Sequence, residues 1–338
     1  MAGITISTPE VSKRGLRPVN LRTDLPELAD LIETAFSSTM DSGGRAAIRE
    51  MRQLSRLGVG LGVLSNLNEL AQGMSLGFVW VESGRIVGNV SVYPADYPRD
   101  MGRVWIIANV AVYPEYRGRG IATGLMNASL DMIHQKSGGM AVLQVDLDND
   151  TARHMYRKLG FQEERAWSQW RRGAYRAMPS HAQIDENQPR IVQRRMGDTG
   201  YELALARQVR PQEQGGVDWL TPAHTNTFQL SALKRLSNWL NLRDIQRLVI
   251  RDEENEAILS WLQIESAFGV SSRQLTLMNH PLDTGTNANA LIGLAVRRYG
   301  YEGLNINHPH DDQIIARVLR AHQFTPRRQV MHMRYIFR

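Results

Sequence analysis

The stretch YRGRGIA, residues 116–122, places two arginines among glycines at a junction between two kinds of pattern. The apolar run before it, VWIIANVAV at 104–112, is typical of a buried strand, and apolar residues after it recur at helical spacing. Glycine allows a ligand to approach the main chain closely, and the first amides of a helix have no intrahelical partners. The junction therefore predicts a site for an anion, to which Arg117 and Arg119 add full charges.

The same seven residues also suit a plain strand-to-helix turn with solvated arginines, and their letters leave both interpretations open. Two phosphate-binding loops are excluded. A Walker A loop needs a lysine, and none occurs from Arg117 to Thr123. A dinucleotide-binding fingerprint needs G-x-G-x-x-G, but after Gly118 and Gly120 the next glycine, Gly124, comes one place late.

The letters do fit R-x-x-G-x-A, from Arg117 to Ala122, after a strand that ends V-A-V-Y-P. Here the chain resembles the Gcn5-related N-acetyltransferase (GNAT) family, whose acetyl-CoA motif is Q/R-x-x-G-x-G/A at this junction. A second stretch, DNDTARHMYRKLGF at 148–161, is similar to that family's second motif, with Asn, Ala, Tyr and Gly-Phe in the same order and spacing.

The resemblance implies acetyl-CoA as co-substrate. It implies that main-chain amides of the loop hold the pyrophosphate, and the residues concerned are Arg117, Gly118, Arg119, Gly120, Ile121, Ala122 and Thr123. In the family the preceding strand splays from its neighbour, so the backbone of Val110, Ala111 and Val112 is expected to pair with the pantetheine arm. Asn149 matches the family's cofactor-contacting asparagine, although its place before a predicted helix also suits a plain N-cap.

The resemblance further implies that Tyr156 is the general acid. A phenol with a pKa of about 10 can supply a proton to the departing CoA thiolate, but the spacing of Tyr156 on its helix also suits an ordinary core tyrosine. A main-chain N–H near Val112 would stabilise the oxyanion. Asp146 and Glu115 lie near the expected cleft and are candidates for the base that takes a proton from the acceptor amine.

The chain of 338 residues is about twice as long as a typical single domain, and its patterns divide it in two. Residues 1–177 hold both motifs, 178–190 form a polar stretch that we interpret as a linker, and 191–338 repeat the same order of elements. The expected class is α/β, with two tandem GNAT-like domains that each contain a mixed, mostly antiparallel sheet flanked by helices.

The second domain is expected to be a degenerate copy. Alignment on the proline after the apolar strand sets Thr284 against Arg117 and Asn287 against Gly120. Leu319, which cannot donate a proton, stands at the place of the tyrosine acid. We therefore predict that residues 191–338 have no acetyl-CoA site, pack on the first domain and form a wall of the acceptor cleft.

Histidines and tryptophans in the second half offer alternative sites. We interpret His308 and His310, two apart beside prolines, as part of a turn and a helix cap, so no metal site is expected. Trp219, Trp239 and Trp261 could line a pocket, but buried core is the commoner place for tryptophan.

Composition limits the partners. Lys+Arg 40 against Asp+Glu 34 gives a net charge of +6, which suits an anionic ligand, but no nucleic-acid-binding module is recognisable and nucleic acid is not expected as a partner. The absence of cysteine excludes disulfides and an acyl-cysteine intermediate. No apolar run approaches the roughly 20 residues of a membrane span, so we expect a cytoplasmic protein without a membrane partner.

These observations together predict an N-acetyltransferase that moves an acetyl group from acetyl-CoA to a primary amine by direct attack in a ternary complex. The acceptor is a small-molecule or peptide amine, and the sequence leaves its identity open, together with the choice between monomer and homodimer. The alternative is a non-catalytic acyl-CoA-binding sensor or regulatory protein.

Overall fold

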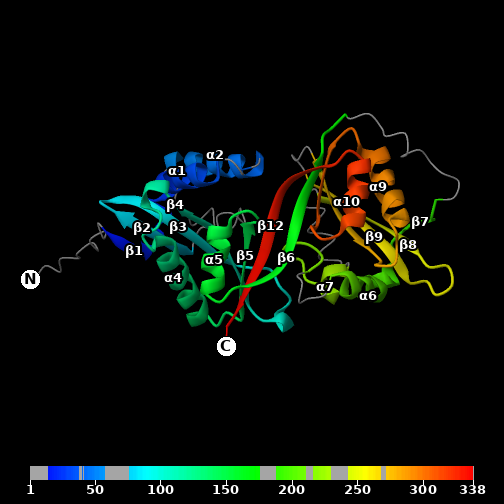
Figure 1. The fold of residues 1–338 in the computed structure, drawn as a ribbon, viewed down its shortest axis with the longest axis horizontal. Helices are drawn as coiled ribbons and strands as arrows, with labels where there is room; N and C mark the ends of the chain where they lie inside the picture. Colours follow the sequence, from blue (N-terminus) through cyan, green and yellow to red (C-terminus); the bar gives the residue numbers. More distant parts are fainter. Residues whose placement is uncertain are drawn as a thin grey trace, which may run out of the picture.

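The structure, a computed structural model, describes residues 14–37, 40, 42–57, 76–175, 188–210, 216–229, 243–267 and 272–337. Within these residues the strands of both halves join in one 12-stranded sheet, with helices on its two faces (Figure 1). The expected α/β class is confirmed. Of the predicted linker, residues 178–187 lie outside the described residues.

Strands and helices alternate through the first half as the sequence patterns predict. Its elements are β1 (Gly15–Pro18), α1 (Leu25–Phe36), α2 (Ser42–Leu57), β2 (Gly77–Glu82), β3 (Arg85–Pro94), β4 (Val104–Val112), α4 (Ile121–Gln135), β5 (Met140–Asp146), α5 (Asp150–Lys158) and β6 (Gln162–Arg172).

The second half repeats this order. Its elements are β7 (Ile191–Gln193), α6 (Thr199–Val209), α7 (Thr225–Phe228), β8 (Arg243–Arg251), β9 (Ile258–Ala267), β10 (Ser272–Asn279), α9 (Thr286–Tyr299), β11 (Gly303–Pro309), α10 (Gln313–Ala321) and β12 (Thr325–Ile336).

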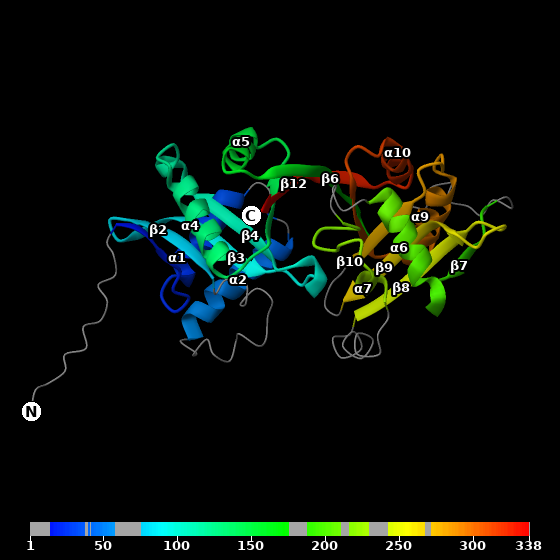
Figure 2. The same ribbon diagram turned by 90° about the horizontal axis from the view of Figure 1, so that it is seen from below.

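The two halves exchange their last strands, which the sequence analysis did not predict. The strand order is β1-β2-β3-β4-β5-β12-β6-β11-β10-β9-β8-β7, so β12 lies between two strands of the first half. It pairs with β5 from Val330 opposite Asp146 to Ile336 opposite Met140, while β6 pairs with β11. Figures 1 and 2 show β6 and β12 side by side at the centre of the molecule. The predicted domain boundary at residues 178–190 stays a prediction. In the sheet, the pairing of β6 with β12 joins the two halves.

Side-chain packing follows the exchanged strands. Met333 of β12 is fully buried in the core of the first half, and Trp170 of β6 is buried in the core of the second half. A smaller cluster bridges the two, because Trp219 and Leu220 pack against Val104 and Ile106. Each half therefore depends on the other for part of its core.

Because Met333 fills the core of the first half from the end of the chain, Met333→Ala is expected to lower the free energy of unfolding by about 2–5 kcal/mol. Hydrogen exchange should show the loss at the amides of β5, where the partner of Met333 is Leu143, 190 residues earlier in the chain. An effect at that distance in sequence has to pass through the pairing of the two strands. Gln329→Ala, at an exposed position of the same strand, is the control. Unchanged protection of β5 in Met333→Ala would contradict the shared core.

Candidate active site

The loop between β4 and α4 adopts a conformation that requires its glycines. Gly118 and Gly120 have φ angles of +75° and +77°, a region that residues with a Cβ rarely adopt. Gly120 is the N-cap of α4 and has no side-chain cap. The first helical hydrogen bond runs from Gly124 N to Gly120 O at 2.9 Å, so the amides of 121–123 precede the ladder. A Cβ at Gly118 or Gly120 would meet nothing within 4 Å, so the space beside these two glycines is open.

The two arginines of the loop form hydrogen bonds to nearby main-chain carbonyls. Arg117 Nε donates to the carbonyl of Val112 at 3.1 Å, and Arg119 Nη2 donates to the carbonyl of Glu115 at 2.8 Å. The guanidinium of Arg119 also lies 5.0 Å from the ring centroid of Tyr116. Both cations are thus held beside the open amides, where they add positive potential to that of the helix terminus.

Strands β4 and β5 pair only at their first residues and then separate. Their parallel pairing runs from Val104 opposite Met140 to Ile106 opposite Val142. Farther along β4, Asn109 has a φ of +52° at an irregularity in the pairing with β3. The separated ends leave the main chain of residues 110–112 beside a gap, as the splay expected from the family resemblance requires.

A cavity of about 450 Å³ opens at this gap. It draws its walls from α1, α2, β4, β5, α5 and the strands near the junction of the halves. Its lining residues are Ile32, Phe36, Met40, Gly44, Ala47, Ile48, Met51, Tyr93, Ile106, Ile107, Ala108, Asn109, Val110, Leu143, Gln144, Val145, Asp146, Asn149, Ala152, Tyr156, Gln169, Trp219 and Arg328. Of the predicted site residues, Val110, Asp146, Asn149 and Tyr156 line this cavity. Ala111, Val112, Glu115 and the loop residues 117–123 are not among its lining residues.

Tyr156 enters the cavity wall from the buried side of α5. Its side chain is almost fully buried, and its ring lies 5.9 Å from that of Phe161. Burial raises the pKa of the Tyr156 phenol well above its ordinary value, because the phenolate would lose its hydration. The phenol therefore holds its proton at neutral pH, the form that a general acid needs.

Asn149 performs the structural task that its position predicts. Its Oδ1 accepts a hydrogen bond from Ala152 N at 3.1 Å, which caps α5. Because Asn149 also lines the cavity, capping and ligand contact do not exclude one another.

Asp146 ends β5 and is paired with a residue from the far end of the chain. Arg328 Nε of β12 donates to Asp146 Oδ1 at 2.5 Å. Gln169 of β6 stands opposite Arg328 in the sheet, and both line the cavity. Neither was found from sequence, because the motifs end at residue 161 and only strand exchange brings β12 to β5.

The three tryptophans singled out in the second half have different places. Trp219 lines the cavity, so its interpretation as a core residue is incomplete. Trp261 is buried and donates from Nε1 to Glu202 at 2.8 Å, as a core tryptophan would. Trp239 lies outside the described residues.

The second half has a loop like that of the first half, but the expected alignment was wrong by two residues. Gly285, with a φ of +110°, is the N-cap of α9 and so corresponds to Gly120, where Asn287 was expected. A Cβ at Gly285 would lie 3.1 Å from Ile314 Cγ2 and 3.4 Å from Val318 Cγ2. The space that is open above Gly120 is thus filled by α10 in the second half.

The amides at the start of α9 are also taken by a side chain. The Asp283 carboxylate accepts from Gly285 N at 3.0 Å and from Asn287 N at 3.3 Å. An internal carboxylate therefore occupies the place where the first half leaves its helix N-terminus open.

The gap between β10 and β11 is crossed by a buried cation. Arg210 Nη2 donates to the carbonyl of Leu277 and to His308 Nδ1, each at 3.3 Å, and His308 Nε2 lies 2.9 Å from Asp312 Oδ2. Burial lowers the pKa of Arg210 to about 10 and that of His308 to about 4. Among the described residues there is no group of three or more His, Cys, Asp or Glu side chains suited to a metal ion.

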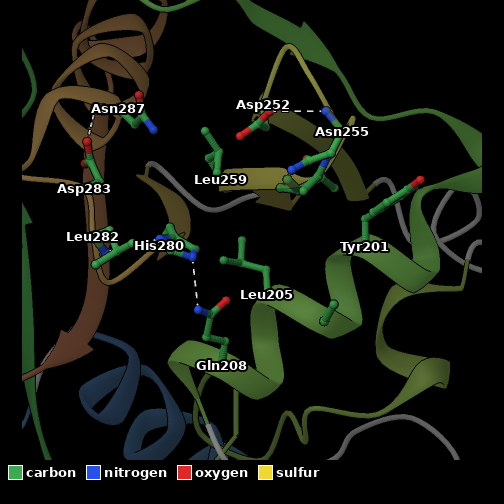
Figure 3. Close-up of a pocket in the computed structure, with 13 residues that line it drawn as sticks. Tyr201, Leu205, Gln208, Asp252, Asn255, Leu259, His280, Leu282, Asp283 and Asn287 are labelled. Carbon is green, nitrogen blue, oxygen red and sulfur yellow. Dashed lines mark hydrogen bonds between the residues drawn. The ribbon is translucent and has the colours of Figure 1, made fainter.

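A second pocket, of about 500 Å³, lies in the second half between α6, the start of β9 and the loop before α9 (Figure 3). Several of its polar side chains form hydrogen bonds to neighbouring protein groups. Gln208 Nε2 lies 3.0 Å from His280 Nε2, and Asp252 Oδ1 accepts from the main-chain amides of Glu254 and Asn255. We therefore place the candidate active site in the cavity of the first half.

Comparison with known proteins agrees with this placement. Residues 48–161 match the acetyltransferase (GNAT) family model. The chain is similar over its whole length to a GCN5-related N-acetyltransferase from Sphaerobacter thermophilus, with a TM-score of 0.60, 14% identity and 96% of each chain covered. At that identity the similarity shows the fold: this chain has the GNAT fold.

Two curated acetyltransferases are similar to part of the chain. An N-alpha-acetyltransferase 30 from Schizosaccharomyces pombe is 38% identical over 84 residues, which is 25% of this chain and 55% of that protein. An N-alpha-acetyltransferase RimI from Mycobacterium tuberculosis is 41% identical over 56 residues, 17% of this chain and 34% of that protein. The chain thus spans about half of the length of the first of these relatives and about a third of the second. Among the described residues, no helix combines the length and apolarity that crossing a membrane demands.

Gly120→Ala adds a methyl group to the N-cap of α4 and strains a left-handed residue. If the loop holds coenzyme A, as the sequence predicts, binding of coenzyme A is expected to weaken at least tenfold in calorimetry, with a loss of stability of about 1–2 kcal/mol. Gly84→Ala is a matched control, because Gly84 has a φ of +81° and equally open space in the turn between β2 and β3. Equal affinities in the two variants would contradict a ligand site at the start of α4.

Proposed function

We propose that this protein is an N-acetyltransferase that transfers the acetyl group of acetyl-CoA to a primary amine in a ternary complex. The observation that carries the proposal is a cavity at the gap between β4 and β5, lined by a buried, protonated Tyr156, in a half whose helix α4 begins just after β4 without a side-chain cap. The relatives named as N-alpha-acetyltransferases support an amine as the nucleophile.

The residues of the first half fit the parts of acetyl-CoA. The amides of 121–123, with the loop from Arg117 to Gly120, would bind the pyrophosphate, because they offer unpaired donors and positive potential. The main chain of residues 110–112 would pair with the pantetheine arm in the gap beside β5. Asn149 would contact the cofactor from the start of α5.

Acetyl-CoA supplies a thioester carbonyl, to which the amine nitrogen adds as the carbon–sulfur bond breaks. Tyr156 would donate its proton to the leaving sulfur, a role for which its buried phenol is prepared. Asp146 would accept the proton that the amine loses, directly or through water, and a main-chain amide near Val112 would stabilise the carbonyl oxygen.

The second half is proposed to be a degenerate copy. The helix N-terminus that corresponds to the anion site is bonded to Asp283, the space over Gly285 is filled by Ile314 and Val318, and Arg210 bonds to the strand that would face the pantetheine. What remains is a structural role, since this half supplies β12 to the first sheet and Trp219 and Arg328 to the cavity.

Calorimetric titration with acetyl-CoA is therefore expected to give one site per chain. Two amides at the start of α9, those of Gly285 and Asn287, already donate to the Asp283 carboxylate, whereas α4 begins without a side-chain cap. Gly120→Ala should weaken that one site. Two sites per chain would contradict the proposed loss of function in the second half.

Tyr156→Phe is expected to lower kcat by about 10²–10⁴-fold and to leave acetyl-CoA affinity within about threefold, because the proton donor is lost while the ring is kept. Tyr335→Phe is the control, since Tyr335 packs on the same Phe161 ring but does not line the cavity. Full activity of Tyr156→Phe would overturn its role as the acid. Acetyl-CoA binding without transfer to any amine would instead favour a non-catalytic acyl-CoA sensor.

A further inference from the structure

The cavity of the first half has a charged end, and its charges come from two distant parts of the chain. Arg328 lies on β12 where the register with β6 shifts, and its side chain is 32% exposed. Its Nε is committed to Asp146. In the part of the chain that the structure describes, no residue accepts a hydrogen bond from the two Nη groups of Arg328. The outer edge of the guanidinium is thus free, and this edge suits a carboxylate bound through two parallel hydrogen bonds.

Asp146 places a negative charge beside this free edge. Only Oδ1 of its carboxylate is bonded to Arg328, and Oδ2 has no hydrogen-bond partner among the described residues. The Asp146 side chain is 18% exposed, so it is partly shielded from water but not closed off. A positive and a negative group side by side in a cavity wall are complementary to a ligand that carries the opposite pair, an ammonium group next to a carboxylate.

Gln169 adds a neutral donor and acceptor to the same end. It stands opposite Arg328 in the pairing of β6 with β12 and lines the cavity. Within the described ranges its side-chain amide has no hydrogen-bond partner. A carboxylate at Arg328 could therefore receive a further hydrogen bond from Gln169.

The cavity also has an apolar end. Ile32 and Phe36 of α1 and Ile48 and Met51 of α2 line it, together with Met40 between the two helices. These helices lie over the strands of the first half (Figure 1). Methionine side chains adapt to irregular shapes, so this end suits an aliphatic, thioether or aromatic group.

We propose that the acceptor is a free α-amino acid with an apolar side chain, bound by its carboxylate to Arg328 and by its side chain to the apolar end. This proposal rests on the acetyl transfer proposed above. The ammonium first loses one proton to water, and the amine nitrogen then forms a bond to the thioester carbonyl carbon. The carbon–sulfur bond breaks, the second amine proton passes to Asp146, directly or through water, and Tyr156 gives a proton to the leaving sulfur. The products are an N-acetylamino acid and coenzyme A.

A peptide or protein N-terminus fits this end less well. Its first residue carries an amide where the amino acid carries a carboxylate, so the free edge of Arg328 would face a neutral group. Trp219 also stands in the wall at the junction with the second half. The charge and the walls thus favour a small zwitterion over a polypeptide.

The experiment compares acetyl transfer to L-leucine, L-methionine and L-phenylalanine with transfer to their carboxamides, which have the same shape without the negative charge. Wild-type protein is expected to show a kcat/KM at least tenfold higher for the free amino acids. Arg328→Gln should remove this preference: kcat/KM for the amino acids should fall at least tenfold more than kcat/KM for the carboxamides, because the lost pairing with Asp146 affects both classes of amine and the lost carboxylate contact affects only the acids. Arg328→Lys keeps the charge without the planar fork and should give an intermediate preference.

Arg327→Gln is the matched control, because Arg327 is the exposed neighbour on the same strand and the change removes the same charge. It should keep the full preference. Thermal unfolding of all three variants shows whether each one is still folded. The carboxamide rates give a second check, because an unfolded variant would lose activity towards the acids and the carboxamides alike.

Equal rates for acids and carboxamides, a higher kcat/KM for an N-terminal tetrapeptide, or no transfer to any of the six amines would overturn the proposal. Acetyl-CoA titration tells the two failures apart. If acetyl-CoA still binds at the loop containing Gly120 and another amine is acetylated, the acceptor class alone is wrong. If acetyl-CoA does not bind, the proposed function fails with it.

Discussion

The pairing of β12 with β5 is the constraint on which the rest of this structure depends. Without β12, the separated end of β5 would be an edge strand with unpaired main-chain groups, and the core of the first half would lose Met333. With β12 in place, Arg328 is set beside Asp146, and two residues that are 182 positions apart become one charged group in the cavity wall. The last strand of the chain thus completes both the sheet and the proposed acceptor site of the first half.

The two halves form an internal comparison of the same fold with and without an open site. In the first half, α4 begins at a glycine with free space above it and no side-chain cap. In the second half, α9 begins at a glycine in the same left-handed region, but Asp283 caps it and α10 covers it. A helix N-terminus attracts an anion only while its amide donors are free. The two halves therefore have the same backbone fold but differ in whether these amides can bind a ligand.

Much of the first half could be predicted from its letters, because the signals are local. The alternation of apolar runs with helical spacing places β4, α4, β5 and α5, and the glycines of the loop mark residues that need positive φ angles. The same logic worked less well in the second half. There, counting from Pro281 set Asn287 against Gly120, but the loop is two residues shorter and the glycine is Gly285. A shortened loop shifts the alignment of the helix that follows without changing the order of strand, loop and helix. A single sequence carries no signal that reveals such a shift.

The sequence by itself determined the order of the elements, the place of the glycine loop and the positions of Asn149 and Tyr156, because each depends on backbone conformation or on spacing along one helix. Only the tertiary structure decided which strand lies next to β5, and so which side chains face Asp146. Strand pairing is a contact between main chains, whose hydrogen-bonding groups are the same in every residue except proline, and its partners are selected by the packing of the whole sheet. For that reason Arg328, Gln169 and Trp219 became part of the cavity only when the chain was folded.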